Sequence, residues 1–120
     1  MSAPTRTYDL YEVIKVPFPF SDSKATKIRP ALILSAAKHF NGKIGLSIMA
    51  MITSVKSNQE LWSTDVVIED LNSVQLPAPS LIRFKLFTLD HRLIIGRLGA
   101  LSELDQRQVQ RKLREILVLH

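Results

Sequence analysis

Residues 26–35, "TKIRPALILS", are the stretch that best indicates a sheet in this chain and the place of a candidate functional arginine at it. The apolar run at 31–36 has the length of a short strand. Pro30 has no N–H to pair, and the residue before a proline favours an extended backbone, so Arg29 is expected at the rim of the sheet. A guanidinium held there suits bidentate recognition of a phosphate. A surface ion pair is the alternative interpretation of this arginine.

The residues before this stretch predict a strand and then a loop. "YEVIKVPFPF" at 11–20 is rich in β-forming residues. Pro17 and Pro19 are expected to end its regular pairing, because proline donates no ladder hydrogen bond. The small polar residues of 21–28 predict an exposed loop.

The residues after it predict a hairpin. Asn41-Gly42 is the strongest short hairpin signal, and it leads into a mostly apolar strand at 44–52. A hairpin brings the start of one strand beside the end of the next. Arg29 and Thr53 are therefore expected on the same edge of the sheet.

Further strands are shorter. The pattern predicts strands at 65–69, 81–84 and 92–101, with a polar loop at 53–64 and a stiff two-proline turn at 76–80. The two glycines within 92–101 indicate a bulge or a close approach of another backbone.

The C-terminal segment has the signature of a helix. Ser102 is a good N-cap, with Glu103 and Asp105 in the first turn. One apolar face follows the helical spacing, at Val109, Leu113, Ile116 and Leu117. Several short strands with one terminal helix predict a mainly β (α+β) fold, a small and strongly bent sheet or barrel capped by that helix.

Length and composition narrow the class of protein. The 120 residues predict a single domain over 1–120. The first residues lack the apolar core of a signal peptide, and the run at 44–52 is too short to span a bilayer, so no membrane is expected and the location is expected to be cytoplasmic. Sixteen Lys and Arg against eleven Asp and Glu give a net charge of +5. A small basic domain attracts polyanions, and nucleic acid is the first to consider.

Several kinds of chemistry are not indicated. There is no cysteine, and the three histidines are scattered without the spacing of metal ligands. Phosphate-binding loops, nucleophile elbows and dinucleotide fingerprints are missing as well. We therefore predict no metal site, and an enzyme of this sequence is expected to work without a cofactor.

Other polar residues have two interpretations each. Thr53 and Ser54, at the end of a strand, either cap the following loop or line the same rim as Arg29. Arg83 and Lys85 flank Phe84, which places both cations on one face of a strand. The basic stripe on the terminal helix is interpreted as a solvated face rather than an RNA contact; it consists of Arg107, Arg111 and Arg114.

A series of stretches along the chain carries a resemblance to a known family and follows that family's order. These stretches are "YEVIKVPFPFSD", "KIRPALILS", "MITS", "LPAPSLIR", "LFTLD" and "RLGALSELD", with a final helix after them. In them the chain resembles the MazF/PemK-like toxins of bacterial toxin–antitoxin pairs. The resemblance covers about Tyr11 to Leu117. It implies a small SH3-like barrel with a C-terminal helix that forms a homodimer. It also implies a metal-independent endoribonuclease that cuts single-stranded RNA, such as mRNA, at short sequences and is held inactive by a cognate antitoxin.

The resemblance assigns roles to residues. Arg29 matches the family's catalytic arginine and Thr53 its active-site threonine. RNA contacts are expected of seven further residues, Ser21, Lys24, Lys27, Ser54, Lys56, Arg83 and Lys85. The 2′-OH of RNA would attack the phosphorus and leave a cyclic phosphate and a 5′-OH end, while Arg29 offsets the charge that builds on the phosphoryl oxygens.

The chain departs from the family pattern at three places. Tyr11 stands where the family usually has a glycine, directly before Glu12. Lys85 stands where many members carry an acid, two residues after the arginine that matches Arg83. No histidine lies within 21–28, where some members have one.

Two other functions stay open at this point. A toxin of the same fold can act without catalysis by binding a protein such as DNA gyrase, and that hypothesis predicts binding through the C-terminal helix. A degenerate member of the family would bind RNA or the antitoxin without cutting RNA. Both remain alternatives because fold alone does not fix function.

Overall fold

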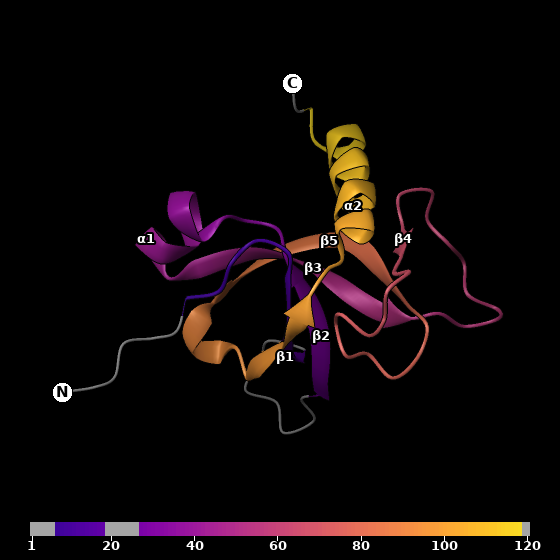
Figure 1. The fold of residues 1–120 in the computed structure, drawn as a ribbon, viewed down its shortest axis with the longest axis horizontal. Helices are drawn as coiled ribbons and strands as arrows, with labels where there is room; N and C mark the ends of the chain where they lie inside the picture. Colours follow the sequence, from indigo (N-terminus) through magenta and orange to yellow (C-terminus); the bar gives the residue numbers. More distant parts are fainter. Residues whose placement is uncertain (1–6, 19–26, 119–120) are drawn as a thin grey trace.

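The computed structural model describes residues 7–18 and 27–118, which form one strongly bent antiparallel sheet with a C-terminal helix (Figure 1). The strands in these residues are β1 (Glu12–Phe18), β2 (Lys27–Ile33), β3 (Leu46–Ser54), β4 (Val66–Val67), β5 (Ser80–Asp90) and β6 (Gly96–Ala100). Their order in the sheet is β4-β5-β3-β2-β1-β6. The helical segments are a π-helical turn (Ala37–Asn41), α1 (Gly42–Ile44), a 3-10 turn (His91–Leu93) and α2 (Glu103–Ile116). The predicted mainly β fold with a terminal helix is confirmed.

The central strands bury side chains on both faces of the sheet, because successive residues of a strand point to opposite sides. One cluster packs with Val109 of α2 and includes Val13, Leu32, Ala50 and Ile52. The other cluster, on the opposite face, includes Ile14, Val16, Ala31, Ile33 and Met49. Burial on both faces accounts for the continuous apolar runs in β2 and β3, where a half-exposed strand would alternate with polar residues.

The connection between β2 and β3 is not the predicted Asn41-Gly42 hairpin turn. Residues 37–44 are helical, and the left-handed position that ends this segment is taken by Gly45, with φ of 82°. Asn41 is fully buried, and its amide donates to the carbonyl oxygens of Tyr8 at 2.8 Å and Ser35 at 2.6 Å. These hydrogen bonds, one of them to a residue 33 positions away, fix Asn41 in a way that a two-residue turn does not allow. The antiparallel pairing of β2 with β3 is nevertheless present.

Pro17 does not end the pairing of β1, contrary to the prediction; it lies opposite Ile28 within the β1–β2 ladder. The pairing of β1 with β6 stops at Lys15, whose carbonyl accepts from the N–H of Ile95 at 2.8 Å. Backbone groups alternate sides along a strand, so the nitrogen of Pro17 faces the same side as the backbone groups of Lys15, the side of β6. Because β6 does not extend past Lys15, no ladder hydrogen bond is lost at Pro17. Pro19 lies outside the described residues.

Several predicted boundaries move. The 31–36 strand begins earlier, at Lys27, and ends at Ile33, so two residues of the predicted 21–28 loop are in β2. The 65–69 strand shortens to two residues, and the 92–101 strand begins at Gly96. The 81–84 strand extends to Asp90, because β5 pairs with β3 through a bulge: Met51 lies opposite Arg83, whereas Ala50 lies opposite Leu86. A bulge adds residues to one strand and bends the sheet.

Gly99 is both at a bulge and at a close approach, as its strand pattern predicted. Val13 pairs with Gly99 and Ile14 with Arg97, which leaves Leu98 as the extra residue of β6. A Cβ atom at Gly99 would lie 2.1 Å from the carbonyl oxygen of Ser73. No residue with a side chain fits here without moving the backbone.

Tyr11 adopts a left-handed backbone, with φ of 70°, at the position where the family pattern has glycine. This conformation costs a residue with a side chain about 1 kcal/mol. The contacts of Tyr11 offset it: its ring packs against the core cluster beside α2, and its hydroxyl accepts from Gln110 Nε2 at 2.8 Å. The strand start is therefore attached to the helix by a side chain that glycine lacks.

The start of α2 is fixed by its predicted cap and by a buried carboxylate. Ser102 Oγ accepts from the N–H of Asp105 at 3.3 Å, which confirms the N-cap. Asp105 is fully buried, and its carboxylate accepts from the N–H groups of Glu69 at 3.0 Å and Asp70 at 3.1 Å. The helix is thus joined to the segment that follows β4. Leu117, predicted on the apolar face, lies at the C-cap and is 40% exposed.

His91 is a buried side chain outside the sheet ladder. Its Nε2 lies 2.6 Å from the hydroxyl of Ser47, and its ring makes an edge contact with Tyr8 at 5.6 Å between centroids. Burial lowers the pKa of His91 below its ordinary value of 6.5, and the negative charge of Asp90 opposes this only in part. The folded state therefore holds His91 in its neutral form at neutral pH.

Replacing Asp105 with alanine is expected to destabilise the fold by about 2–4 kcal/mol. The substitution leaves two backbone N–H groups beside α2 without their acceptor. Urea unfolding followed by circular dichroism measures the change. The control is Glu103→Ala on the same helix turn, where only an exposed pair with Arg107 is lost, so its effect should stay within about 0.5 kcal/mol. Equal effects of the two substitutions would contradict the role given to Asp105.

Acidification from pH 7 to pH 5 is expected to lower the free energy of unfolding through His91. Its pKa is lower in the folded state, so the unfolded chain binds the extra proton and stability is lost as the pH falls below about 6.5. Urea unfolding at pH 7, 6 and 5 measures the slope. His91→Gln should have a flatter slope over this range, whatever its stability at pH 7, and an unchanged slope would count against the assignment.

Candidate active site

A pocket of about 260 Å³ opens on the sheet where β2, β3 and β5 lie side by side. Its lining residues are Phe18, Arg29, Met51, Ile52, Thr53, Lys56, Arg83 and Lys85. A second depression of about 190 Å³ shares Arg29 and Thr53 with it and adds Ser54 and Ser80. Arg29, Ile52 and Thr53 line both hollows, and of these Arg29 and Thr53 carry the polar groups, so they are the centre of the candidate site.

The register of β2 and β3 places these two residues together. The β2–β3 ladder runs from Ile33 opposite Met49 to Ala31 opposite Met51, and Arg29 and Thr53, two residues further along each strand, line the same pocket. Arg29 lies inside β2, opposite Val16 of β1, and not at the rim before the strand as predicted. Arg29 and Thr53 are nevertheless brought to one pocket, although the connection between β2 and β3 is not the predicted turn. Thr53 and Ser54 end β3 and take part in its pairing with β5, opposite Leu81 and Ser80.

The predicted site residues fall into three groups. Arg29, Thr53, Lys56, Arg83 and Lys85 line the main pocket, and Ser54 lines the adjoining one. Lys27 is exposed at the start of β2, opposite Phe18, and lines neither hollow. Ser21 and Lys24 lie outside the described residues.

Arg29 carries a guanidinium with unused hydrogen-bonding capacity. Its Nε is buried and has no hydrogen-bond partner within the described part of the chain. Its Cζ lies 6.0 Å from the centre of the Phe18 ring, and no described carboxylate forms an ion pair with it. A surface ion pair, the alternative interpretation of this arginine, is therefore not seen among these residues. A buried donor without an acceptor is costly, and a guanidinium without a carboxylate partner is available to an anion in the pocket that it lines.

Arg83 is in the opposite situation, because its charge is already paired. Its Nε donates to Asp65 Oδ1 at 3.1 Å, and its Nη2 donates to Asp65 Oδ2 at 2.7 Å and to the Glu60 carbonyl at 3.0 Å. The guanidinium also stacks on Trp62, 4.6 Å from the ring centre. The carboxylate that pairs with Arg83 is thus Asp65, from the segment before β4.

Asp65 is held in its ionised form. Burial by itself raises the pKa of Asp65, but hydrogen bonds from the Arg83 guanidinium and the Trp62 N–H outweigh it and keep the pKa below the ordinary 3.8. Its side chain is only 5% exposed, and both oxygens accept hydrogen bonds. This carboxylate fixes Arg83 and is not free to take a proton from a substrate.

The cations of the pocket therefore differ in whether an ion pair already neutralises them. Among the residues that the structure covers, Lys56 and Lys85 form no ion pair, and the same holds for Arg29. Three unpaired positive charges around Thr53 make a site for an anion with several charged oxygens, as in a nucleic-acid backbone.

Some pocket and neighbouring residues were not predicted. Phe18, Met51 and Ile52 form apolar walls of the pocket. Trp62 lies in the predicted loop at 53–64 and Asp65 begins the predicted strand at 65–69, and neither pattern indicates which side chains these residues meet. No signal in the sequence indicated that Asp65 and Trp62 would contact Arg83.

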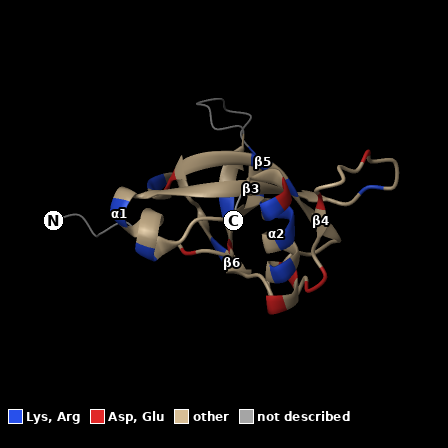
Figure 2. Ribbon diagram, turned by 90° about the horizontal axis from the view of Figure 1, so that it is seen from above, with Lys and Arg blue, Asp and Glu red and all other residues tan. Residues whose placement is uncertain are grey.

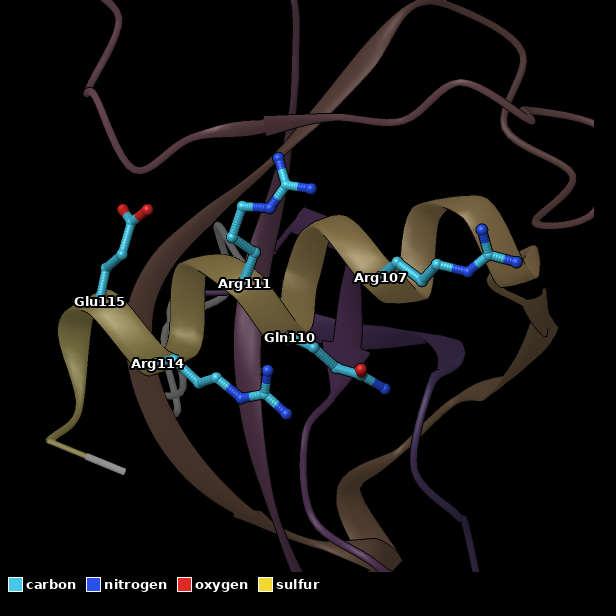
Figure 3. Close-up of a pocket in the computed structure, with 5 residues that line it drawn as sticks. All are labelled: Arg107, Gln110, Arg111, Arg114 and Glu115. Carbon is cyan, nitrogen blue, oxygen red and sulfur yellow. The ribbon is translucent and has the colours of Figure 1, made fainter. Parts of the chain in front are cut away.

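The basic stripe of α2 forms a separate, open depression of about 510 Å³ (Figure 3). Five α2 side chains line it, Arg107, Gln110, Arg111, Arg114 and Glu115. Figure 3 shows the three guanidinium groups spread along the helix rather than meeting at one point. Arg107 pairs with Glu103 at 3.2 Å. Lys and Arg recur along this helix in Figure 2, as a solvated basic face would require.

Two further features concern metals and membranes. Within residues 7–18 and 27–118, no three His, Asp or Glu side chains cluster in a way that would hold a metal ion. No helix in these ranges is long and apolar enough to cross a membrane.

Asp65→Ala is expected to lower the free energy of unfolding by about 2–3 kcal/mol, because a largely buried guanidinium loses its paired acceptor. The single tryptophan of the chain, Trp62, should also become more mobile. Urea unfolding and the fluorescence anisotropy of Trp62 measure these effects. Glu115→Ala, which removes an exposed pair with Lys112, is the matched control and should change neither by much. Unaltered anisotropy in Asp65→Ala would show that Asp65 does not fix this cluster.

The fold matches solved toxin structures over nearly its whole length. It is similar to a chain of the MazE–MazF crystal structure from Deinococcus radiodurans, with 21% identity, 96% of this chain and 100% of that chain covered, and a TM-score of 0.74. It is also similar to an endoribonuclease in complex with its cognate antitoxin from a Mycobacterial species, with 13% identity, 94% and 97% covered, and a TM-score of 0.70. A third is the Mycobacterium tuberculosis toxin MazF-mt6, with 17% identity, 91% and 98% covered, and a TM-score of 0.70.

Identities of this size show the fold alone, and no curated protein sequence matches the chain. The family is shown by the sequence itself, because residues 10–117 match the PemK-like, MazF-like toxins of type II toxin–antitoxin systems. The match takes in β1 through α2 and therefore every described residue of the pocket. The chain belongs to this family of type II toxin–antitoxin toxins.

Proposed function

We propose that this chain is a metal-independent endoribonuclease toxin that cuts single-stranded RNA, with mRNA as the expected substrate, at short sequences. The observation that supports this most directly is Arg29: a guanidinium with a buried, unpartnered Nε that shares a basic pocket with Thr53. Two solved neighbours are described as endoribonucleases, one of them bound to its cognate antitoxin, which agrees with this proposal at the level of the family.

The chemistry uses the nucleophile that RNA itself carries. The 2′-oxygen attacks the adjacent phosphorus, the bond to the 5′-oxygen breaks, and the products are a cyclic phosphate and a 5′-OH end. The proton of the 2′-OH leaves as the new bond forms, and the departing 5′-oxygen gains a proton. The protein has to align these oxygens and offset the charge on the phosphoryl oxygens.

Arg29 and Thr53 suit the electrostatic part of this reaction. Arg29 offers donors to the non-bridging oxygens and stays charged, because the pKa of a guanidinium exceeds about 12. Thr53 of β3, in the same pocket, donates from its hydroxyl to the same phosphate. Asp65 is excluded as the general base because both of its oxygens are used by Arg83 and Trp62.

The remaining contacts and partners follow the same proposal. Lys56 and Lys85 would hold neighbouring phosphates, and Ser54 would contribute a hydroxyl from the adjoining hollow. Ser21, Lys24 and Lys27 stay predicted RNA contacts from the first loop and the start of β2. A cognate antitoxin, a homodimeric assembly and a cytoplasmic location belong to the proposal as well.

A second candidate is a toxin that acts by binding a protein through α2. The observation in its favour is the basic depression over Arg107, Arg111 and Arg114, which would accept an acidic surface. The spread of the three guanidinium groups, and the absence of an unpartnered buried donor among them, make this surface less specific than the pocket at Arg29.

Arg29→Ala is expected to reduce RNA cleavage by at least about 100-fold, because the principal charge-stabilising donor is removed. Thr53→Ala, which removes one hydroxyl donor, should reduce it by about 10- to 100-fold. The assay uses excess EDTA and maps the product ends, which should be 5′-OH. Arg111→Ala on α2 is the matched control and should cleave as the wild type does.

Other results would overturn the proposal. Intact RNA with the wild-type protein would remove the nuclease function and leave RNA binding without cleavage or a protein target. Loss of toxicity in Arg111→Ala together with full toxicity in Arg29→Ala would favour the α2-binding toxin. Cleavage that is abolished by EDTA would contradict the metal-independent mechanism.

A further inference from the structure

We infer that Trp62 is a substrate-binding residue, a platform on which one base of the RNA stacks beside the candidate active site. This inference rests on the proposed RNA substrate and adds a residue to which no role was given by the sequence. It is carried by the position of Trp62, by the way its ring is held, and by the charges around it.

Trp62 lies in the segment between β3 and β4, which extends away from the body of the sheet in Figures 1 and 2. It is the single tryptophan of the chain, and 41% of it is exposed. The exposed part of its ring is available for contact with a ligand. The same segment supplies Lys56 to the pocket.

The ring is connected to the pocket through two of its cations. The Arg83 guanidinium lies 4.6 Å and the Lys85 ammonium 5.6 Å from the ring centre, and both residues also line the pocket. Trp62 is therefore one side chain away from the space that Arg29 and Thr53 face. A strand of RNA whose phosphate sits at Arg29 would bring a neighbouring nucleotide to this ring.

The ring is also held in place despite its position in a loop. The N–H of Trp62 donates to Asp65 Oδ2 at 2.8 Å, and the N–H of Asp65 donates back to the Trp62 carbonyl at 3.0 Å. Asp65 in turn binds Arg83, on which the ring rests. A base that stacks on a fixed ring loses less free energy to ordering of the protein than it would on a free one.

These contacts change the role of Arg83. Three of its donor bonds go to Asp65 and to the Glu60 carbonyl, and its charge is paired with a carboxylate. It is therefore poorly suited to hold a phosphate, and we assign it as a positioning residue that supports Trp62. The phosphates are left to the unpaired cations Arg29, Lys56 and Lys85.

The kind of ligand that fits this site follows from the separation of the unpaired cations from the aromatic ring. Unpaired bases of single-stranded nucleic acid stack on exposed aromatic rings while cations follow the backbone, and the stacking depends little on which base it is. A double strand keeps its bases covered and does not fit this arrangement. An apolar segment of a protein partner is the competing occupant, and the test below separates the two.

The test measures binding without cleavage. The probes are a labelled 2′-O-methyl oligonucleotide of mixed sequence, in which the nucleophile is blocked, and the same backbone without bases. Trp62→Ala should bind the base-bearing strand about 10-fold more weakly than the wild type does and bind the abasic strand equally well. Trp62→Phe should keep most of the affinity. Leu61→Ala, a change at the neighbouring exposed residue of the same segment, should bind both strands as the wild type does.

Salt dependence and fluorescence give two independent readouts. Stacking involves no phosphate, so the slope of log affinity against log salt should be unchanged in Trp62→Ala and reduced in Lys56→Ala. In the wild-type protein the base-bearing strand should quench the fluorescence of Trp62, and the abasic strand should not. This readout needs no variant, so it holds even if a substitution disturbs folding.

The inference is overturned if Trp62→Ala binds the base-bearing strand as tightly as the wild type, or if it loses equal affinity for the abasic strand. Either result together with normal RNA cleavage by the wild type would reject the platform and leave the nuclease standing. Failure of the wild type to bind or cut any strand would reject both. Quenching of Trp62 by a protein partner but by neither strand would assign the ring to protein binding.

Discussion

The antiparallel pairing of β3 with β2 on one side and β5 on the other is the constraint on which the site depends. It brings Arg29, Thr53, Arg83 and Lys85 to the same pocket. A slip of one residue in either ladder would turn the whole set of side chains to the other face of the sheet. The register is fixed by burial on both faces, since Leu32 and Ala50 pack on one side while Ile33 and Met49 pack on the other.

The two arginines of the pocket differ in whether their charge is paired within the protein. Arg83 is neutralised by Asp65, whereas Arg29 has a buried Nε without a partner in the described residues. Stability alone would favour pairing both, because an unsatisfied buried donor is a loss that folding has to offset. An unpaired guanidinium at Arg29 suits a binding site for an anion in spite of its cost in stability. A guanidinium already paired inside the protein would have to break that pair before it could bind a phosphate.

The sequence predicted the strands around Arg29 and the whole of α2, because these depend on local patterns: an apolar run, a proline, an N-cap and a helical repeat. Arg29 and Thr53 do line one pocket, as their predicted proximity requires, but the stated cause, a turn at Asn41-Gly42, was wrong. Asn41 hydrogen-bonds to Tyr8 and Ser35, and such long-range competition is invisible to a dipeptide signal. The partners Trp62 and Asp65 could not be predicted for a related reason, since closure of the segment between β3 and β4 determines what they meet.

The departures from the family pattern show how this chain keeps the architecture with other residues. Tyr11 accepts a left-handed backbone that glycine would adopt freely, and it gains contacts with the core and with Gln110 of α2. Lys85 stands on β5 where many members carry an acid, and Asp65 supplies a carboxylate to Arg83 from outside that strand. An acid on β5 would lower the positive charge of the pocket, whereas Lys85 adds to that charge and forms no ion pair within the described residues. The exchange therefore makes the pocket a stronger site for a polyanion.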